Sequence, residues 1–260
     1  MNVNNFPKVG IINNSGEVYS LKNISYFAVD EDISLKNFNK LKNYKDYDYL
    51  FFYENGILYL RDFSVDIPSI FVDFTSGDIN YRRKTSGIKQ EILRAIGLEK
   101  NKKINVLDTT AGLCKDSFIF ATYGINVLAI EQNPLIYNIT LNALENAKND
   151  HEISDIVKNI KLINMNSIDF LKESNCDFDC IYLDPMFPQK NKTSLCKKEM
   201  QVFHNLAFYG NNEELFELSM LKTKNRVVVK RMLKNDYIVN KKPSYQIIGK
   251  TIRYDIYLKS

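Results

Sequence analysis

Beyond residue 100, short apolar runs alternate along the chain with segments in which apolar residues recur at helical spacing. The expected strands are Ile104–Leu107, Asn126–Ile130, Ile160–Ile163, Cys180–Leu183 and Arg226–Lys230. The expected helices between them are Ser117–Tyr123, Leu135–Ala147, Ile168–Leu171 and Glu213–Leu221. Strand and helix in alternation are typical of βαβ units, so we predict an α/β fold around a mostly parallel sheet.

The last two apolar runs, Tyr245–Ile248 and Thr251–Leu258, lie on either side of Gly249 with no long helix between them. Strands joined by so short a connection pair antiparallel. We therefore expect an antiparallel C-terminal hairpin to close one edge of the sheet.

The chain before residue 75 is rich in aromatic and β-branched residues. Two such runs, Tyr47–Tyr53 and Ile57–Phe63, meet at Asn55-Gly56, and Asn-Gly is a strong hairpin signal. The run Ile70–Phe74 predicts a further strand. We predict a small β-rich N-terminal subdomain over residues 1–85 and a larger domain over residues 86–260.

Turn-forming residues at 75–78 precede a basic cluster at 82–84, a composition that indicates a hinge between the two parts. Apolar residues at helical spacing then predict a helix over Ile88–Ile96, and Gly97 is placed to end it.

The composition of the 260 residues, with 45% hydrophobic and 25% charged residues, is that of an ordinary globular protein and excludes a disordered or collagen-like chain. The net charge of +4 permits an anionic partner without requiring one. No apolar stretch approaches the roughly 18 residues of a membrane span, and no secretory signal is evident, so we expect a cytoplasmic protein.

Four cysteines without a two-residue gap between any pair, together with only two histidines, offer poor material for a metal site or a Ser-His-Asp triad. We expect reduced, structural thiols and no metal. The oligomeric state stays open.

Ligands of doubly wound sheets bind beyond the carboxyl ends of the strands, so the residues just after each predicted strand are the ones to inspect. The first such turn runs from Asp108 to Asp116 and contains Gly112. It is neither a Gly-x-Gly-x-x-Gly turn nor a phosphate loop, which disfavours dinucleotides and nucleoside triphosphates. Its two carboxylates suit a cationic ligand with an amino group; the alternative is a plain strand-to-helix turn with a capping Asp.

Glu131 follows the next strand, about 20 residues past the glycine turn, where an acidic side chain binds ribose hydroxyls. A first-turn helix charge ahead of Pro134 is the alternative. After the third strand, Asn166 and Ser167 offer an amide and a hydroxyl to a purine edge, although Ser167 equally suits a helix N-cap.

The strongest signal follows Cys180–Leu183, which runs directly into Asp184-Pro185-Met186-Phe187. This turn offers a carboxylate, a proline-fixed carbonyl and an aromatic face. Together these groups can grip a planar base that carries an exocyclic amine.

These turns resemble the motifs of class I S-adenosylmethionine (SAM)-dependent methyltransferases, and Asp-Pro-x-Phe resembles their amino-methylating branch. The resemblance extends to one family, the ribosomal small-subunit RNA guanine-N2 methyltransferases J. It rests on the segment from Tyr182 to Lys190, on Lys197-Lys198-Glu199-Met200, on Val72-Asp73-Phe74 and on Arg82-Arg83-Lys84. It implies a Rossmann-like class I methyltransferase sheet and SAM as methyl donor.

The resemblance also implies a set of site residues. The donor-binding pairs fall on Lys115 and Asp116, Glu131 and Gln132, and Asn166 and Ser167, with Asp184 at the active centre. This chain departs from the family pattern at Cys114 and Lys115, where Gly and Arg are common, and at Asn166, where Ser is commoner. A non-Gly residue resists positive φ, which puts the backbone conformation at Cys114 in question.

The implied reaction is methyl transfer to the N2 amine of a guanine in small-subunit (16S) rRNA. Asp184 and the Pro185 carbonyl would accept the two N–H bonds of that amine, and Phe187 would stack on the base. Candidate RNA-binding residues are the cations Arg82, Arg83, Lys84, Lys190, Lys192, Lys197 and Lys198. A solvated surface, or for the arginines a clamp between subdomains, is the alternative for these cations.

Three rival functions remain. An amino methyltransferase for DNA adenine or protein glutamine would keep the fold and change the acceptor, but DNA enzymes of that kind usually need a target-recognition insert that this chain lacks. A noncatalytic RNA-binding assembly protein would keep the donor pocket for stability. A nicotinamide-dependent oxidoreductase is disfavoured by the missing glycine pattern.

Overall fold

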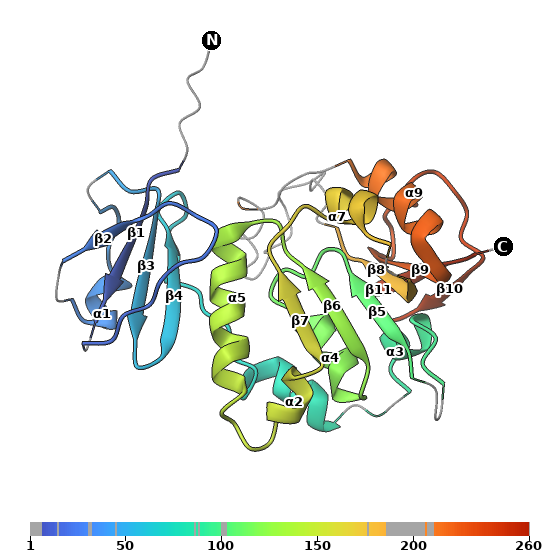
Figure 1. The fold of residues 1–260 in the computed structure, drawn as a ribbon, viewed down its shortest axis with the longest axis horizontal. Coiled ribbons are helices and arrows are strands. Elements are labelled where there is room, and N and C mark those ends of the chain that lie inside the picture. Colours follow the sequence, from blue (N-terminus) through green and yellow to red (C-terminus); the bar gives the residue numbers. More distant parts are fainter. Residues whose placement is uncertain are drawn as a thin grey trace, which may run out of the picture.

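A computed structural model describes residues 7–14, 16–30, 33–44, 46–85, 87, 89–99, 103–175, 177–185, 206 and 211–259. Its larger sheet has seven strands in the order β10-β11-β9-β8-β5-β6-β7 (Figure 1). They are β5 (Asn105–Asp108), β6 (Asn126–Ile130), β7 (Ile160–Ile163), β8 (Phe178–Leu183), β9 (Thr223–Met232), β10 (Tyr245–Ile248) and β11 (Ile252–Leu258). The strands from β9 to β7 are parallel, whereas β11 pairs antiparallel with both β9 and β10. The predicted α/β class and the antiparallel C-terminal hairpin are confirmed.

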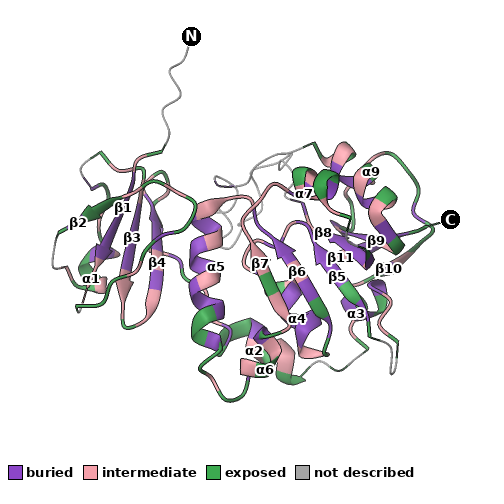
Figure 2. Ribbon diagram, viewed as in Figure 1, coloured by how far each residue is buried: buried purple, intermediate pink, exposed green. Residues whose placement is uncertain are grey.

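Helices cover both faces of this sheet (Figure 1). Successive side chains of a strand point to opposite faces, so Val106 packs with one group of helices and Leu107 with the other. The Val106 face is covered by α2 (Gly77–Thr85), α3 (Glu91–Ala95), α4 (Lys115–Thr122), the C-terminal half of α5 (Pro134–Ala147) and α6 (Ser154–Val157). The Leu107 face is covered by α7 (Ser167–Glu173) and α9 (Asn212–Lys222). Figure 2 shows the central strands largely buried between these layers.

The N-terminal part forms a separate four-stranded sheet in the order β2-β1-β3-β4. It comprises β1 (Val9–Asn13), β2 (Phe27–Val29), β3 (Tyr49–Glu54) and β4 (Ile57–Asp62), with the short helix α1 (Leu35–Phe38) on one face. The predicted hairpin of β3 and β4 is present, with Asn55 and Gly56 both at positive φ. Sequence patterning missed β1 and β2, which pair in parallel.

Helix α5 lies between the two sheets (Figure 1). Leu135, Ile136 and Ile139 pack in the core of the N-terminal sheet, whereas Ala143 and Ala147 pack in the core of the central sheet. One helix therefore takes part in both hydrophobic cores.

Three asparagines spaced four residues apart on α5 bind the main chain of the N-terminal part. Asn138 exchanges hydrogen bonds with the N–H and C=O of Lys22 at 2.8 and 2.9 Å. Asn142 accepts from the N–H of Leu58 at 2.9 Å and donates to the C=O of Gly56 at 3.0 Å. Asn146 donates to the same Gly56 carbonyl at 2.7 Å. A spacing of four residues places all three amides on one face of the helix.

The segment between the sheets differs from the prediction. In the predicted strand Ile70–Phe74, only Ile70 pairs, through a single bridge to Leu60. Asp73 instead accepts hydrogen bonds from the Thr75 N–H and from the hydroxyls of Thr75 and Ser76, which turns the chain into α2. The predicted hinge is thus a helix, and the basic cluster forms its last turn, where cations are favoured by the helix dipole.

Helix α3 begins three residues later than the prediction from Ile88. It ends as expected at Gly97, which has a φ of +81° and lets the N–H of Leu98 reach the C=O of Leu93 at 3.0 Å. The division of the chain at residue 85 stays a prediction. The structure packs Phe74 and Ile79, which precede that boundary, in the core of the central sheet. Within the described part of the chain, no helix is long and apolar enough to cross a membrane.

Candidate active site

The loop after β5 is held by a buried carboxylate. Asp108 is 2% exposed and accepts hydrogen bonds from the Ser117 hydroxyl at 2.6 Å and the Thr110 N–H at 3.2 Å. Burial raises the pKa of Asp108 to about 7 despite these bonds. Asp108 therefore ties the loop to the first turn of α4, where Ser117 lies, and its carboxylate faces inward.

The same loop turns through two residues in the left-handed region. Gly112 has a φ of +51° and Cys114 a φ of +54°. The structure thus places a non-Gly residue in the conformation that the sequence put in question, with the Cys114 side chain fully buried in the core beneath α4. A Cβ built on Gly112 would meet no atom of the described residues within 4 Å. The backbone at Gly112 therefore faces open space, where a ligand can approach closely.

Glu131 lies at the end of β6 and joins this loop. One of its carboxylate oxygens accepts from the Gly112 N–H at 2.9 Å and the other from the Asn133 N–H at 2.7 Å. Glu131 is 8% exposed, and burial raises its pKa to about 7. A carboxylate offers about four lone-pair directions, so its oxygens can accept ribose hydroxyls as well.

Gln132 and Asn166 meet across the ends of β6 and β7. The Asn166 amide donates to the Gln132 side-chain oxygen at 3.0 Å, and the Asn166 oxygen caps α7 by accepting from the N–H of Ile168 at 2.8 Å. Asn166, rather than Ser167, is therefore the N-cap of this helix. Ser167 is buried and donates to the C=O of Thr109 at 2.6 Å, which links α7 to the loop after β5.

Asp184 follows β8, and a cation from the neighbouring strand β9 lies beside it. The Lys230 ammonium is 2.8 Å from one oxygen of Asp184 and 2.8 Å from one oxygen of Asp116. The Asp184 side chain is 40% exposed, whereas the side chains of Lys230 and Asp116 are 24% and 13% exposed. The Asp184 N–H donates to the Thr110 hydroxyl at 2.6 Å, so the loop after β5 also fixes the start of the Asp184-Pro185 turn.

Asp116 collects two further donors besides Lys230. The Tyr182 hydroxyl donates to it at 2.7 Å, and the Arg82 guanidinium lies 3.3 Å from its other oxygen. These partners hold the pKa of Asp116 below its usual range against the opposing effect of burial, and the first among them is Lys230. At Asp184, burial prevails over Lys230 and raises the pKa.

The remaining predicted site residues are placed as follows. Lys115 is exposed at the first position of α4. Arg83 and Lys84 each form a 2.8 Å ion pair with Glu152, which precedes α6. Pro185 is buried directly after Asp184. Phe187, Lys190, Lys192, Lys197 and Lys198 lie outside the described residues.

The sequence predicts that Asp108, Glu131 and Asp184 lie together at the carboxyl ends of the parallel strands, and the structure places them there. Sequence reasoning missed Lys230, although this residue ends the predicted strand Arg226–Lys230. The rule applied to the other strands, inspection of their carboxyl ends, would have found it. It also missed Thr110 and Tyr182, which contact the site through partners that only the folded chain brings near.

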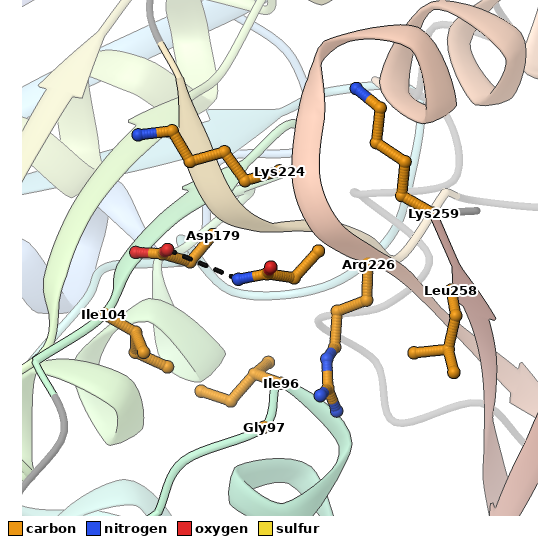
Figure 3. Close-up of a pocket in the computed structure, with 9 residues that line it drawn as sticks. Ile96, Gly97, Ile104, Asp179, Lys224, Arg226, Leu258 and Lys259 are labelled. Carbon is orange, nitrogen blue, oxygen red and sulfur yellow. Dashed lines mark hydrogen bonds between the residues drawn. The ribbon is translucent and has the colours of Figure 1, made fainter.

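A pocket of about 270 Å³ lies near the amino ends of the parallel strands, away from Asp184 and Glu131 (Figure 3). Its charged groups already have partners in the protein: Arg226 donates to the Tyr245 hydroxyl at 3.0 Å, Lys259 to the C=O of Thr223 at 2.6 Å, and Asp179 accepts from the N–H of Asn105 at 2.9 Å. The charges of this pocket therefore stabilise the ends of strands. Across the described ranges, no three His, Cys, Asp or Glu side chains gather as a metal-binding group.

Comparisons with known proteins agree with this geometry. Residues 34–259 match a family model described as putative SAM-dependent methyltransferase. A SAM-dependent methyltransferase structure from Neisseria gonorrhoeae superposes with a TM-score of 0.72 at 26% identity, covering 96% of each chain.

Two relatives carry the name ribosomal RNA small subunit methyltransferase J. The protein from Francisella philomiragia is 35% identical over 243 residues, which are 92% of this chain and 98% of that one. The protein from Nitrosococcus oceani is 40% identical over 193 residues, which are 73% of this chain and 76% of that one. The fold, the site at the carboxyl edge of the sheet and these relatives agree, and the chain belongs to the ribosomal RNA small subunit methyltransferase J family of SAM-dependent methyltransferases.

Proposed function

We propose that this protein transfers the methyl group of SAM to the N2 amine of a guanine in small-subunit rRNA, in the cytoplasm. The observation that carries the proposal is the position of Asp184, a partly exposed carboxylate at the end of β8. It lies at the same edge of the sheet as the open backbone of Gly112 and the buried carboxylate of Glu131. An acceptor group and a donor-binding loop therefore share one edge.

The residues of this edge fit the donor. Glu131 receives the ribose hydroxyls, because it is buried beside the Gly112 backbone and keeps unused lone pairs. Gln132 and Asn166, joined by their own hydrogen bond, lie next to the purine. We assign Lys115 and Asp116, at the start of α4, to the amino acid end of the donor. When bound, SAM supplies an electrophilic methyl group on a sulfonium.

The chain orients the acceptor amine. The lone pair of the guanine N2 is delocalised into the ring, so the amine must be aligned with the methyl group rather than merely brought near. Asp184 and the Pro185 carbonyl accept its N–H bonds, and Phe187 stacks on the base. The N–C bond forms as the S–C bonding pair returns to sulfur, and the surplus proton leaves the nitrogen for Asp184 or water.

Cations on two segments hold the RNA backbone. We assign this role to Lys84 on α2 and to Lys190, Lys192, Lys197 and Lys198 after the Asp184 turn. Arg82 and Arg83 are paired with Asp116 and Glu152, which supports the structural alternative for these two cations. The Lys84 side chain is 51% exposed and remains accessible beside its partner Glu152.

The test is methyl transfer from labelled SAM to small ribosomal subunits that lack the modification, with naked rRNA and DNA in parallel, followed by nucleoside analysis. We expect N2-methylguanosine from the wild type and none from Asp184→Ala. Asp155→Ala, which removes a 92% exposed carboxylate on α6, is the matched control and should behave as the wild type. If the protein binds SAM but methylates neither form of the RNA, the assignment of rRNA as the methyl acceptor is wrong. If only DNA is methylated, DNA is the acceptor instead.

A further inference from the structure

Strand register places Lys230 beside Asp184. Leu183 at the end of β8 pairs with Val229 on β9, so the residues that follow these two, Asp184 and Lys230, lie side by side. Lys230 is also paired with Tyr254 on β11. The lysine thus projects from the middle of three adjacent strands on the face covered by α4, where Tyr182 and Tyr254 are buried.

Charged and titratable groups face Lys230 from every neighbouring element. Asp184 and Asp116 accept its ammonium at 2.8 Å each. Arg82 on α2 lies 3.3 Å from the other oxygen of Asp116. The electrostatic neighbourhood of the two carboxylates is completed by Tyr182, Tyr254, Arg231 and Asp108. Lys230 is the only cation in contact with both Asp116 and Asp184 among the residues that the structure describes.

The contact leaves one oxygen of Asp184 for the acceptor. The ammonium binds Oδ2 of Asp184, and within the described ranges no hydrogen bond is made to Oδ1. The main chain of Asp184 is held independently by the Thr110 hydroxyl at 2.6 Å. One bond therefore fixes the backbone and the other fixes the side-chain rotamer.

We propose that Lys230 is a positioning residue for methyl transfer: it holds Asp184 by one oxygen, so that the other oxygen accepts the hydrogen bond of the target amine. The proposal rests on the proposed function and adds a residue to it. Lysine suits this place because its ammonium is a compact charge with three donors, which can serve two carboxylates at once. It also offsets the repulsion between Asp116 and Asp184, which otherwise face each other as like charges.

The charge of Lys230 has a consequence that a purely structural role lacks. Burial raises the pKa of Asp184, and Lys230 opposes that rise. Removing the ammonium raises this pKa further, so the protonated, nonaccepting form of Asp184 persists to higher pH. Loss of activity on the acid side then begins at a higher pH than in the wild type.

The experiment measures kcat and KM for small subunits from pH 6 to 9 in wild type, Lys230→Met, Lys230→Gln and Lys224→Met. Lys224 is the second residue of the same strand, has a 51% exposed side chain and is the matched control. We expect Lys230→Met to lower kcat about 100-fold, as misplacement of a reacting group does, with a smaller change in KM. Its acid limb should move up by about one pH unit. Lys230→Gln keeps hydrogen-bond donors without charge, so it should show the same shift with a smaller loss of kcat.

The outcomes separate failure of the proposed function from failure of the proposed role of Lys230. If wild type fails to methylate small-subunit rRNA, the proposed function falls. If wild type is active and a folded Lys230 variant matches it in kcat and in the acid limb, the role of Lys230 falls alone. Should Lys230→Met fail to fold, as judged by circular dichroism, Lys230→Gln decides by the same two criteria. A lower kcat with an unmoved acid limb would also overturn the proposal.

Discussion

The main-chain N–H of Gly112 donates to the carboxylate of Glu131 over 2.9 Å, joining two loops that are 19 residues apart in sequence. The first loop follows β5 and the second follows β6, and the two strands are adjacent and parallel. This hydrogen bond places the Gly112 backbone, which faces open space, beside the buried carboxylate of Glu131. Donor affinity should therefore depend on both residues, each in a different way.

Replacing Glu131 by Ala removes the proposed ribose acceptor and the hydrogen-bond partner of the Gly112 N–H. We expect the Kd for SAM, measured by calorimetry, to rise on the order of 10- to 100-fold, since a lost charged hydrogen bond costs about 1.5–3 kcal/mol. Glu217→Ala, on the exposed side of α9, is the control and should leave the Kd unchanged. A Kd within twofold of wild type in Glu131→Ala would remove Glu131 from the donor site.

Replacing Gly112 by Ala tests the open space in front of this backbone. Gly124 provides a matched control, because it too has a positive φ and no described residue has an atom within 4 Å of a Cβ built on it. Both Ala variants should lose about 1–2 kcal/mol of unfolding free energy to backbone strain, measured by urea denaturation. Only Gly112→Ala should also weaken SAM binding, because its methyl group occupies the space of the ligand. Equal donor affinity in the two variants would contradict this assignment.

Stability should depend on pH through Asp108. Burial raises the pKa of Asp108 to about 7 from an ordinary value of 3.8, so the native state binds its proton more tightly than the unfolded chain does. The stabilisation is fully present below about pH 4 and is lost as the pH rises through about 7. Asn at this position does not titrate. The unfolding free energy of wild type minus that of Asp108→Asn should therefore fall from pH 4 to pH 8, by at most about 4 kcal/mol. Urea denaturation curves with the same difference at both pH values would refute the role of Asp108.

Asn142 of α5 should stabilise the protein through its two main-chain hydrogen bonds. Asn142 is 4% exposed and binds both Gly56 and Leu58, so Asn142→Ala leaves a buried N–H without its partner. We expect a loss of about 1–3 kcal/mol in thermal or urea unfolding. Asn149→Ala, on an exposed residue just beyond the same helix, should cost less than about 0.5 kcal/mol. Similar losses of unfolding free energy in the two variants would mean that the Asn142 hydrogen bonds stabilise the protein no more than an exposed asparagine does.

Much of the central sheet could be predicted from local pattern. Its parallel strands are buried on both faces, so they are short continuous apolar runs, and the rule that ligands bind at their carboxyl ends led directly to Glu131 and Asp184. The same local reasoning could not show that Asp108 faces inward. Its orientation depends on Ser117, which α4 brings back over the strand.

Contacts between elements account for what was missed. Helix α2 lacks an apolar stripe, with Ile79 as its one buried residue, and it is held instead by ion pairs to Asp116 and Glu152. The role of Lys230 depends on the order β9-β8 and on strand register, which no local pattern contains. The conformation of Cys114 could not be predicted for a similar reason, because its thiol is buried by residues from other elements while its backbone takes a positive φ.

Asn138, Asn142 and Asn146 of α5 form hydrogen bonds with only the main chain of the N-terminal part, at residues 22, 56 and 58. A hydrogen bond to a main-chain N–H or C=O does not depend on which side chain that residue carries. These hydrogen bonds therefore place no restriction of their own on the side chains of Lys22 and Leu58, provided that the path of the chain is kept. The constraint from these bonds falls on residues 138, 142 and 146, whereas the apolar core that Leu58 shares with Leu135 and Ile139 constrains both sides of the junction.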